Sequence, residues 1–234
     1  MRKIKISSYE HIVILTGAGI SKASGIPTFR GEGGLWNDDE MKRLLVIDEF
    51  YKRPDEVWKF LGSIKEKVLN AYQNIVHNVL SKIENTAKKV TLITQNIDGL
   101  HQKAGSKNVI ELHGSLLRTR CSNGECNLPV FDDFNVYSTA PRCSICNAVL
   151  RPDIVFFNEH LGGTDFLAKV ALRDCDLYIA IGTSGSVAPA SNFARGADYA
   201  GARTILINME EVENPYFHEK ILGKAEEIVP MLFE

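Results

Sequence analysis

The sequence lacks the features that mark membrane, secreted and nucleic-acid-binding proteins. No apolar run reaches the roughly 20 residues that a transmembrane helix needs. The first residues, MRKIKISSYEH, carry charge but hold no apolar core of signal-peptide length. The net charge of -2 argues against tight non-specific binding to nucleic acid or to anionic membranes. We therefore expect a cytoplasmic protein that contacts neither a membrane nor nucleic acid directly.

Cysteine is scarce and unevenly distributed. Four of the five cysteines fall in two pairs, Cys121-x4-Cys126 and Cys143-x2-Cys146, which are sixteen residues apart. Without a secretory signal, such a cluster indicates a metal site before it indicates disulfides. Four thiolates suit tetrahedral zinc and leave no open coordination position, so the sequence predicts one structural zinc ion. The remaining Cys175 is interpreted as a small buried apolar residue.

Short apolar runs that end abruptly in polar or glycine-rich turns predict the fold class. These runs cover residues 11–15, 90–94, 109–112, 177–181 and 204–207. Stretches with helical periodicity lie between several of them, for example over residues 69–83. Strands that alternate with helices predict an α/β fold with a doubly wound, parallel, Rossmann-like sheet. Ligands of such sheets bind at the carboxyl ends of the strands, where these turns fall.

Two stretches do not follow this alternation. Residues 34–67 are helical and charged without a strand signal, and residues 118–151 hold the cysteine pairs. We interpret them as a helical module and a zinc-ribbon module that together form a smaller domain. The large dinucleotide-binding domain then comprises residues 1–33, 68–117 and 152–234.

A glycine turn, TGAGIS over residues 16–21, follows the first predicted strand. Gly17 and Gly19 would let the backbone approach a pyrophosphate, and a following helix would offer free N–H groups. The fingerprint G-x-G-x-x-G is incomplete, because Lys22 stands at the third glycine position. A dehydrogenase would also need an acidic residue at the end of a second strand, but the acidic residues 38–40 follow no strand. A plain tight turn and a dinucleotide site both remain open, whereas the dehydrogenase hypothesis is weakened.

An unusual loop, GIPTFRG over residues 25–31, comes directly after this turn. Arg30 is able to pair with a phosphate in a fork geometry, and Phe29 is able to cover a reactive group. Glycines at 25, 31, 33 and 34 fit a lid that orders when a ligand binds. The alternative is a surface loop with one buried anchor.

Polar side chains follow two of the predicted strands. Gln95, Asn96 and Asp98 come after residues 90–94, and His113 ends the run 109–112. Groups that converge at strand ends can hold a ribose and move a proton. A histidine with a pKa near neutrality is a natural general base, with a typical rate contribution of about 10²–10⁴. The alternative, a structural histidine, is disfavoured because His113 falls in phase with the other ligand-facing turns.

Taken together, these motifs resemble those of the sirtuins, a family of NAD-dependent protein deacylases. The resemblance covers nearly the whole chain, from Gly17 to about Ala225. It rests on TGAGIS-x-x-SGIPTFRG, TQNIDGLHQ-x-AG, ELHGS, the two cysteine pairs, RPDIVFF-x-E, GTSGSVAPA and INME.

The resemblance implies a site that binds NAD as co-substrate and an acyl-lysine protein as an extended strand. His113 would be the general base, and Asn96 and Asp98 would share the catalytic role. The NAD-binding residues would be Gly17, Ala18, Gly19, Ser21, Thr28, Phe29, Arg30, Gln95, Asn96, Ile97, Asp98, Gly182, Thr183, Ser184, Asn208, Met209, Glu210 and Ala225. The substrate would meet Leu61, Ile64, Val155, Phe156, Phe157, Ser186 and Val187, and zinc would bind Cys121, Cys126, Cys143 and Cys146. The reaction would release nicotinamide and transfer the acyl group to ADP-ribose.

The sequence departs from the family pattern at three places. Asn158 replaces the glycine of F-G-E, and the first cysteine pair is two residues wider than usual. The motifs are most similar to those of the branch that removes succinyl groups through a Tyr-x-x-Arg motif. In this sequence Leu61 stands at the tyrosine position and Ile64 at the arginine position. A succinyl carboxylate there would have no guanidinium to pair with, which would cost at least about 1.5–3 kcal/mol of binding free energy. The sequence therefore predicts acetyl or apolar acyl groups, and Lys65 is the residue most able to restore succinyl binding.

Two other functions compete with deacylation. The same site would serve an NAD-dependent ADP-ribosyltransferase or an NAD hydrolase, although an intact His113 favours deacylation. A zinc-ribbon module that binds nucleic acid would need a basic surface. Residues 118–151 mix acidic with basic side chains, which disfavours that function.

Overall fold

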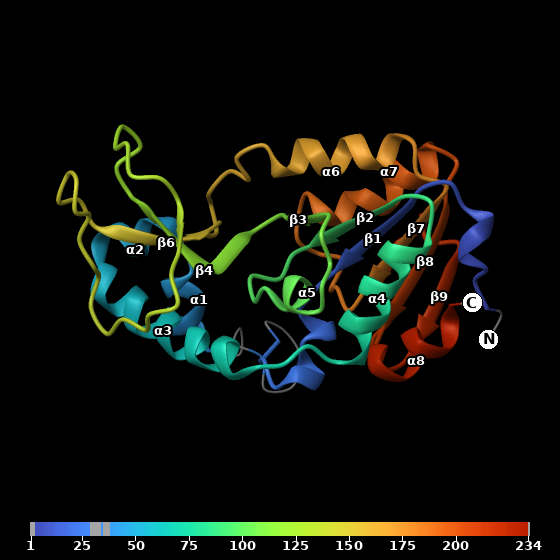
Figure 1. Ribbon diagram of the computed structural model, residues 1–234, viewed down its shortest axis with the longest axis horizontal. Helices are drawn as coiled ribbons and strands as arrows, with labels where there is room; N and C mark the ends of the chain where they lie inside the picture. The colour runs from blue at the N-terminus through green and yellow to red at the C-terminus, as the bar shows by residue number, and fades with distance from the viewer. Residues whose placement is uncertain (1–2, 29–33, 35–37, 234) are drawn as a thin grey trace.

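The structure is a computed structural model that describes residues 3–28, 34 and 38–233, and within these ranges the chain forms two sheets (Figure 1). The larger sheet has six strands in the order β3-β2-β1-β7-β8-β9, and every neighbouring pair is parallel. Its strands are β1 (Ile12–Thr16), β2 (Val90–Thr94), β3 (Val109–Glu111), β7 (Leu177–Ile181), β8 (Arg203–Asn208) and β9 (Glu219–Leu222). The smaller, antiparallel sheet has the order β5-β4-β6, with β4 (Gly114–Cys121), β5 (Phe131–Asp132) and β6 (Leu150–Ile154). The predicted fold class is confirmed.

Helices cover both faces of the larger sheet, as Figure 1 shows. They are α4 (Ile75–Thr86) and α8 (Ala225–Leu232) on one face, and α6 (Thr164–Arg173) and α7 (Phe193–Tyr199) on the other. Ile12 and Ile14 of β1 pack toward α4 and α8, whereas Val13 and Leu15 pack toward α6 and α7. Successive strand residues point to opposite faces, so a strand buried on both sides is apolar throughout.

The helix expected over residues 69–83 is interrupted, and that prediction was wrong between Ala71 and Asn74. Helix α3 (Pro54–Asn70) ends there, and α4 begins after four residues outside any helix. The Asn74 side chain caps α4 by accepting a hydrogen bond from Val76 N at 2.9 Å. Asparagine is among the most favoured N-caps. Both helices bury one face, so apolar residues recur at helical spacing on both sides of the break. The hydrophobic periodicity therefore does not reveal where α3 ends.

The remaining elements are short. They are α1 (Asp39–Leu44), α2 (Ile47–Lys52), α5 (Leu100–Lys103) and the 3-10 segments Ile6–Ser8, Ala18–Ile20, Lys22–Ser24 and Ala190–Asn192. In the described part of the chain, no helix combines the length and apolar character needed to cross a bilayer.

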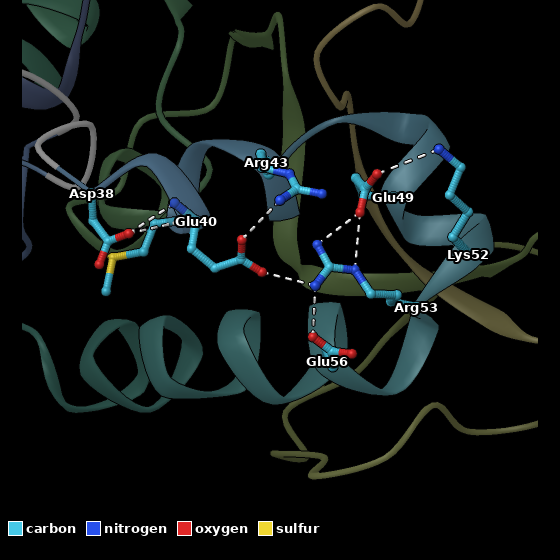
Figure 2. Close-up of polar contacts among 8 residues, drawn as sticks. Asp38, Glu40, Arg43, Glu49, Lys52, Arg53 and Glu56 are labelled. Atoms are coloured by element: carbon cyan, nitrogen blue, oxygen red, sulfur yellow. Dashed lines mark hydrogen bonds and ion pairs between the residues drawn. The ribbon is translucent and has the colours of Figure 1, made fainter.

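Arg53, at the start of α3, ties the three helices of the smaller unit together (Figure 2). Its guanidinium lies 2.8 Å from Glu40 of α1, 2.7 Å from Glu49 of α2 and 2.9 Å from Glu56 of α3. Solvent reaches these groups, so each pair contributes roughly 0–1 kcal/mol. The cluster therefore orients the helices more than it stabilises them.

The helices of the smaller unit and its sheet share one apolar core. Trp58 of α3 is buried and donates a hydrogen bond from Nε1 to Leu150 O at 2.8 Å. This sheet extends past residues 118–151, because β4 begins at Gly114 and β6 ends at Ile154. The division of the chain into domains at the stated boundaries stays a proposal.

Gly114, next to His113, is predicted to be irreplaceable. Its φ of +73° is left-handed, and an added Cβ would lie 2.0 Å from Asp153 O in the paired strand β6. Gly114→Ala should lower the free energy of unfolding by roughly 2–4 kcal/mol, since backbone strain and a clash add. Chemical denaturation measures this change. Gly124→Ala is the matched control: a Cβ there meets nothing within 4 Å, and a change within about 0.5 kcal/mol is expected. Equal changes in both variants would contradict the prediction.

Candidate active site at the strand ends

Two glycine turns meet where β1 and β7 end. These strands run in register, with Thr16 opposite Ile181. A Cβ on Gly17 would lie 2.7 Å from Gly182 O, and one on Gly19 would lie 2.7 Å from Gly182 Cα. Real Cβ atoms do not approach that closely, so the turns pack backbone against backbone. Gly17 and Gly19 thus have a structural role besides the approach to a phosphate that the sequence suggested.

The helix expected directly after the glycine turn is absent from the described residues, where two 3-10 segments follow. The N–H groups of Gly17, Gly19, Ile20 and Ser21 all donate to carbonyls of the protein. The expectation of an α-helix with its dipole at this turn was therefore wrong, and these four amides are not free. The turn is shaped by its packing against Gly182, which a reading of the local sequence does not reveal.

Asn96 and Asp98 bind the glycine turn from the end of β2. Asn96 Nδ2 donates to Gly17 O and to Ser21 Oγ, each at 3.1 Å. Ser21 Oγ in turn donates to Asp98 Oδ2 at 2.7 Å. Burial raises the pKa of Asp98, although hydrogen bonds from Leu100 N–H and the Ser21 hydroxyl act in the opposite direction. The predicted polar residues of β1 and β2 thus form one buried network.

Gln95 joins three strand ends. Its N–H donates to Thr16 O at 2.9 Å, and its Oε1 accepts from Thr183 Oγ1 at 2.8 Å. The carbonyl of Gln95 lies 2.8 Å from His113 Nδ1. A carbonyl only accepts, so Nδ1 carries the proton and Nε2 keeps its lone pair. Burial lowers the pKa of His113 below 6.5, although the hydrogen bond to Gln95 O opposes this. His113 is therefore a neutral base at neutral pH.

A layer of hydroxyl groups that the sequence did not predict lies beneath this site. Thr16 Oγ1 donates to Thr94 Oγ1 at 2.9 Å and lies 2.9 Å from His101 Nε2. Asn96 N–H donates to Thr94 Oγ1 at 3.0 Å. Burial lowers the pKa of His101 to about 3, so the ring is neutral. The available signal was a threonine at the carboxyl end of each of two neighbouring strands.

The other predicted NAD residues lie around the same edge, with different exposure. Ser184 is exposed and lies 2.9 Å from the Ser186 hydroxyl, Oγ to Oγ. Asn208 Nδ2 donates to Glu210 O at 2.9 Å, so this turn after β8 is held internally. Ala18, Thr28 and Ile97 are half-buried, Met209 is exposed, and Ala225 is buried at the start of α8. Phe29 and Arg30 lie outside the described residues.

The predicted substrate segment 155–157 is already hydrogen-bonded. Val155 N–H donates to His113 O, and Phe156 N–H donates to the Glu159 carboxylate, each at 3.0 Å. Phe157 N–H donates to Leu45 O at 2.9 Å. These three amides therefore already have partners within the protein, and the expected contact of this segment with an extended substrate stays a prediction.

The other substrate residues differ in accessibility. Leu61 and Ile64 are buried in the same apolar cluster as Phe156. Ser186 is exposed, and Val187 O accepts a hydrogen bond from Ser191 N at 2.9 Å. Asn158 has a φ of +66°. Asparagine adopts this left-handed conformation more readily than most residues, so the turn keeps a glycine-like backbone.

The four paired cysteines converge, as their spacing predicted. Their Sγ atoms all lie within 4.8 Å of one another, with Cys121 and Cys146 at 3.4 Å and Cys126 and Cys143 at 3.6 Å. Thiolates at about 2.3 Å from a tetrahedral zinc are roughly 3.8 Å apart, so the site fits zinc. Cys121 and Cys143 belong to the core of the smaller unit. Cys175 lies apart, buried against α6 and α7 as expected.

Removal of one thiolate tests the zinc site. Cys126→Ser should abolish stoichiometric zinc and lower the melting temperature, because structural zinc contributes on the order of 10 kcal/mol of binding free energy to folding. Elemental analysis of the purified protein and thermal denaturation measure the two effects. Cys175→Ala, which removes a cysteine outside the cluster, should keep one zinc per chain. Full zinc content in Cys126→Ser would rule out this ligand set.

Comparison with known proteins identifies the family. Residues 17–189 match the model of the Sir2 family. The chain is 40% identical to NAD-dependent protein deacylase 2 of Pyrobaculum aerophilum over 98% of this chain and 92% of that one. It is 43% identical to NAD-dependent protein deacylase of Vibrio cholerae over 97% and 93%. A Sir2 homologue solved with NAD has a TM-score of 0.90 at 38% identity, covering 97% of this chain and 89% of the other. This chain belongs to the Sir2 family.

Proposed function

We propose that this protein is an NAD-dependent protein-lysine deacylase that releases nicotinamide and transfers the acyl group to ADP-ribose. The observation that carries the proposal is the fixed, neutral His113, whose Nδ1–H is bound to Gln95 O at the edge where the glycine turns meet. The deacylase names of the relatives support it. A similar structure, with a TM-score of 0.86 at 33% identity and coverage of 97% and 93%, holds a p53 peptide and NAD⁺.

The first chemical step has to overcome a poor nucleophile. An acyl-lysine amide is neutral, so the ribose carbon that bears nicotinamide must become strongly electrophilic. Asn96 and Asp98 would orient the ribose within a site of low water content. The amide oxygen then bonds to that carbon as its bond to nicotinamide breaks, and nicotinamide leaves with the bonding electron pair.

His113 performs the second step. Its Nε2 accepts the proton of a ribose hydroxyl, and the hydroxyl oxygen bonds to the acyl carbon. Addition of one water and loss of the lysine amine then give free lysine and O-acyl-ADP-ribose. A histidine held neutral by burial suits this task, because its lone pair is available without prior deprotonation.

The remaining assignments are part of the same proposal. The residues of the two glycine turns would contact the pyrophosphate, Gln95 the nicotinamide ribose, and Asn208 and Glu210 the adenosine ribose. The substrate would be a protein whose acyl-lysine passes Phe157, an exposed ring in the segment that follows β6. A cytoplasmic location and the lack of nucleic-acid and membrane partners stay predictions.

Nicotinamide release separates deacylation from the competing activities. With NAD and an acetyl-lysine peptide, the wild-type protein should release nicotinamide and form O-acetyl-ADP-ribose in equal amounts. Without peptide, release should be slow. His113→Ala should reduce product formation at least about 100-fold, the lower range for loss of a general base. Fast release without peptide would instead favour an NAD hydrolase or an ADP-ribosyltransferase.

The acyl preference follows from the environment of α3. Leu61 and Ile64 are 1% and 8% exposed and lie among apolar side chains. Lys65, the residue most able to restore succinyl binding by its sequence position, is 2% exposed, and its Nζ faces Asp133 Oδ1 at 3.9 Å. The ammonium therefore already has a buried counter-charge. These contacts support a pocket for neutral acyl groups.

Two versions of one peptide test the preference. The kcat/KM of the wild-type protein should be at least about tenfold higher for the acetylated than for the succinylated peptide, since an unpaired carboxylate costs 1.5 kcal/mol or more. The variant Leu61→Tyr/Ile64→Arg should shift the ratio toward succinyl by supplying a phenol and a guanidinium. A wild-type preference for succinyl would refute the assignment.

A further inference from the structure

Arg151 of β6 forms a buried ion pair that the proposed chemistry does not use. Its guanidinium binds the Glu159 carboxylate through two parallel contacts of 2.7 Å, Nη1 to Oε1 and Nη2 to Oε2. The side chain of Arg151 is 3% exposed and that of Glu159 20%. Nη2 also donates to Ile154 O at 2.8 Å, so the guanidinium is tied to the end of its own strand.

The same pair holds the turn over residues 156–159. Glu159 Oε2 accepts from Phe156 N–H at 3.0 Å, and Glu159 N–H donates to Phe156 O at 3.2 Å. The guanidinium carbon of Arg151 lies 5.0 Å from the centre of the Phe156 ring and 5.7 Å from that of Phe50. The two rings adjoin each other, with centres 5.5 Å apart, and the planar cation lies against both of them. Together with the bidentate carboxylate at its edge, this contact restricts the position and the orientation of the turn.

This turn lies between the candidate base and the smaller unit. On one side, Val155 N–H donates to His113 O at 3.0 Å. On the other, Phe157 forms a parallel bridge with Val46, which precedes α2. Asn158 stands at the apex in the left-handed conformation, exposed and without a hydrogen bond to any described residue. The turn thus presents Phe157 and Asn158 outward from a fixed backbone.

Stability alone does not account for such a pair. The desolvation of two buried charges offsets most of their attraction, and apolar residues of similar volume often stabilise a fold as well. Burial opposes ionisation of Glu159, but hydrogen bonds from Arg151 and Phe156 N–H outweigh it, so the pKa of Glu159 lies below its ordinary value. The carboxylate therefore stays charged at neutral pH and keeps its directional bonds to the guanidinium.

We propose that Arg151 and Glu159 are positioning residues that fix the 156–159 turn for the acyl-lysine substrate and leave NAD binding unaffected. This inference rests on the proposed function, because the turn matters only if the substrate passes Phe157. The predicted nucleotide contacts lie elsewhere, at the ends of β1, β2, β7 and β8, and are held by separate hydrogen bonds. The pair should therefore act on the substrate side alone.

Steady-state kinetics of a double variant tests this role. Arg151→Met/Glu159→Leu removes both charges at once, so neither is left buried and unpaired. We expect the KM for an acetyl-lysine peptide to rise about tenfold or more, whereas the KM for NAD stays within about twofold. Circular dichroism and thermal denaturation report whether the variant is folded. An unchanged peptide KM in the folded variant would overturn the proposal, as would equal increases in the two KM values.

Single and control variants complete the test. Glu159→Gln keeps the shape of the side chain and provides a second measurement if the double variant does not fold; its peptide KM should rise while its NAD KM stays constant. Arg151→Lys keeps the charge but cannot form the bidentate contact, so its peptide KM should lie between those of the wild-type protein and the double variant. Arg203→Met/Glu219→Leu removes another bidentate pair, between β8 and β9, and should change neither KM. A wild-type protein without deacylation would refute the proposed function itself, a separate outcome.

Discussion

The site depends on a constraint of space at the ends of β1 and β7. Three glycines pack backbone against backbone there, and no Cβ fits between Gly17 or Gly19 and Gly182. This contact fixes where the first turn lies relative to the strands. Ser21 then reaches Asp98, and Asn96 reaches Gly17, because the turn presents its carbonyl and hydroxyl toward β2. Interiors pack at near-crystalline density, so a turn held this way cannot shift without moving its neighbours.

Single residues at the strand ends also hydrogen-bond to several segments at once and so connect the strands to one another. Gln95 contacts three different segments. Its N–H binds Thr16, its carbonyl binds His113, and its side-chain oxygen binds Thr183. Thr94 Oγ1 accepts from two donors in the layer below. Because each partner constrains the others, His113, the proposed base, and the two glycine turns form one unit. Such preorganisation is what an enzyme needs to orient reacting groups without reorganising them.

The sequence predicted what depends on short-range patterns. Apolar runs located five of the six strands of the larger sheet, because strands buried on both faces, such as β1 and β7, read as continuous apolar segments. Cysteine spacing located the metal site. The sequence failed where the outcome depends on distant partners. Thr16 meets residues 78 and 85 positions away, and the turn amides after β1 are used by neighbours that periodicity does not reveal. The break before α4 was hidden for a related reason, since Asn74 acts through a local cap that apolar spacing does not record.

The two sides of the site are built by different means, and this difference bears on specificity. The proposed nucleotide side rests on parallel strands and on glycine packing, where a Cβ added to Gly17, Gly19 or Gly182 would displace the backbone. The proposed acyl side rests on side chains, namely Leu61 and Ile64 on α3 and the buried pair of Lys65 with Asp133. Exchanging side chains on a helix leaves the strand ends in place, so under the proposed function the acyl preference can change while the nucleotide site stays constant. The proposed preference for neutral acyl groups is compatible with the proposed nucleotide site because the two depend on different parts of the fold.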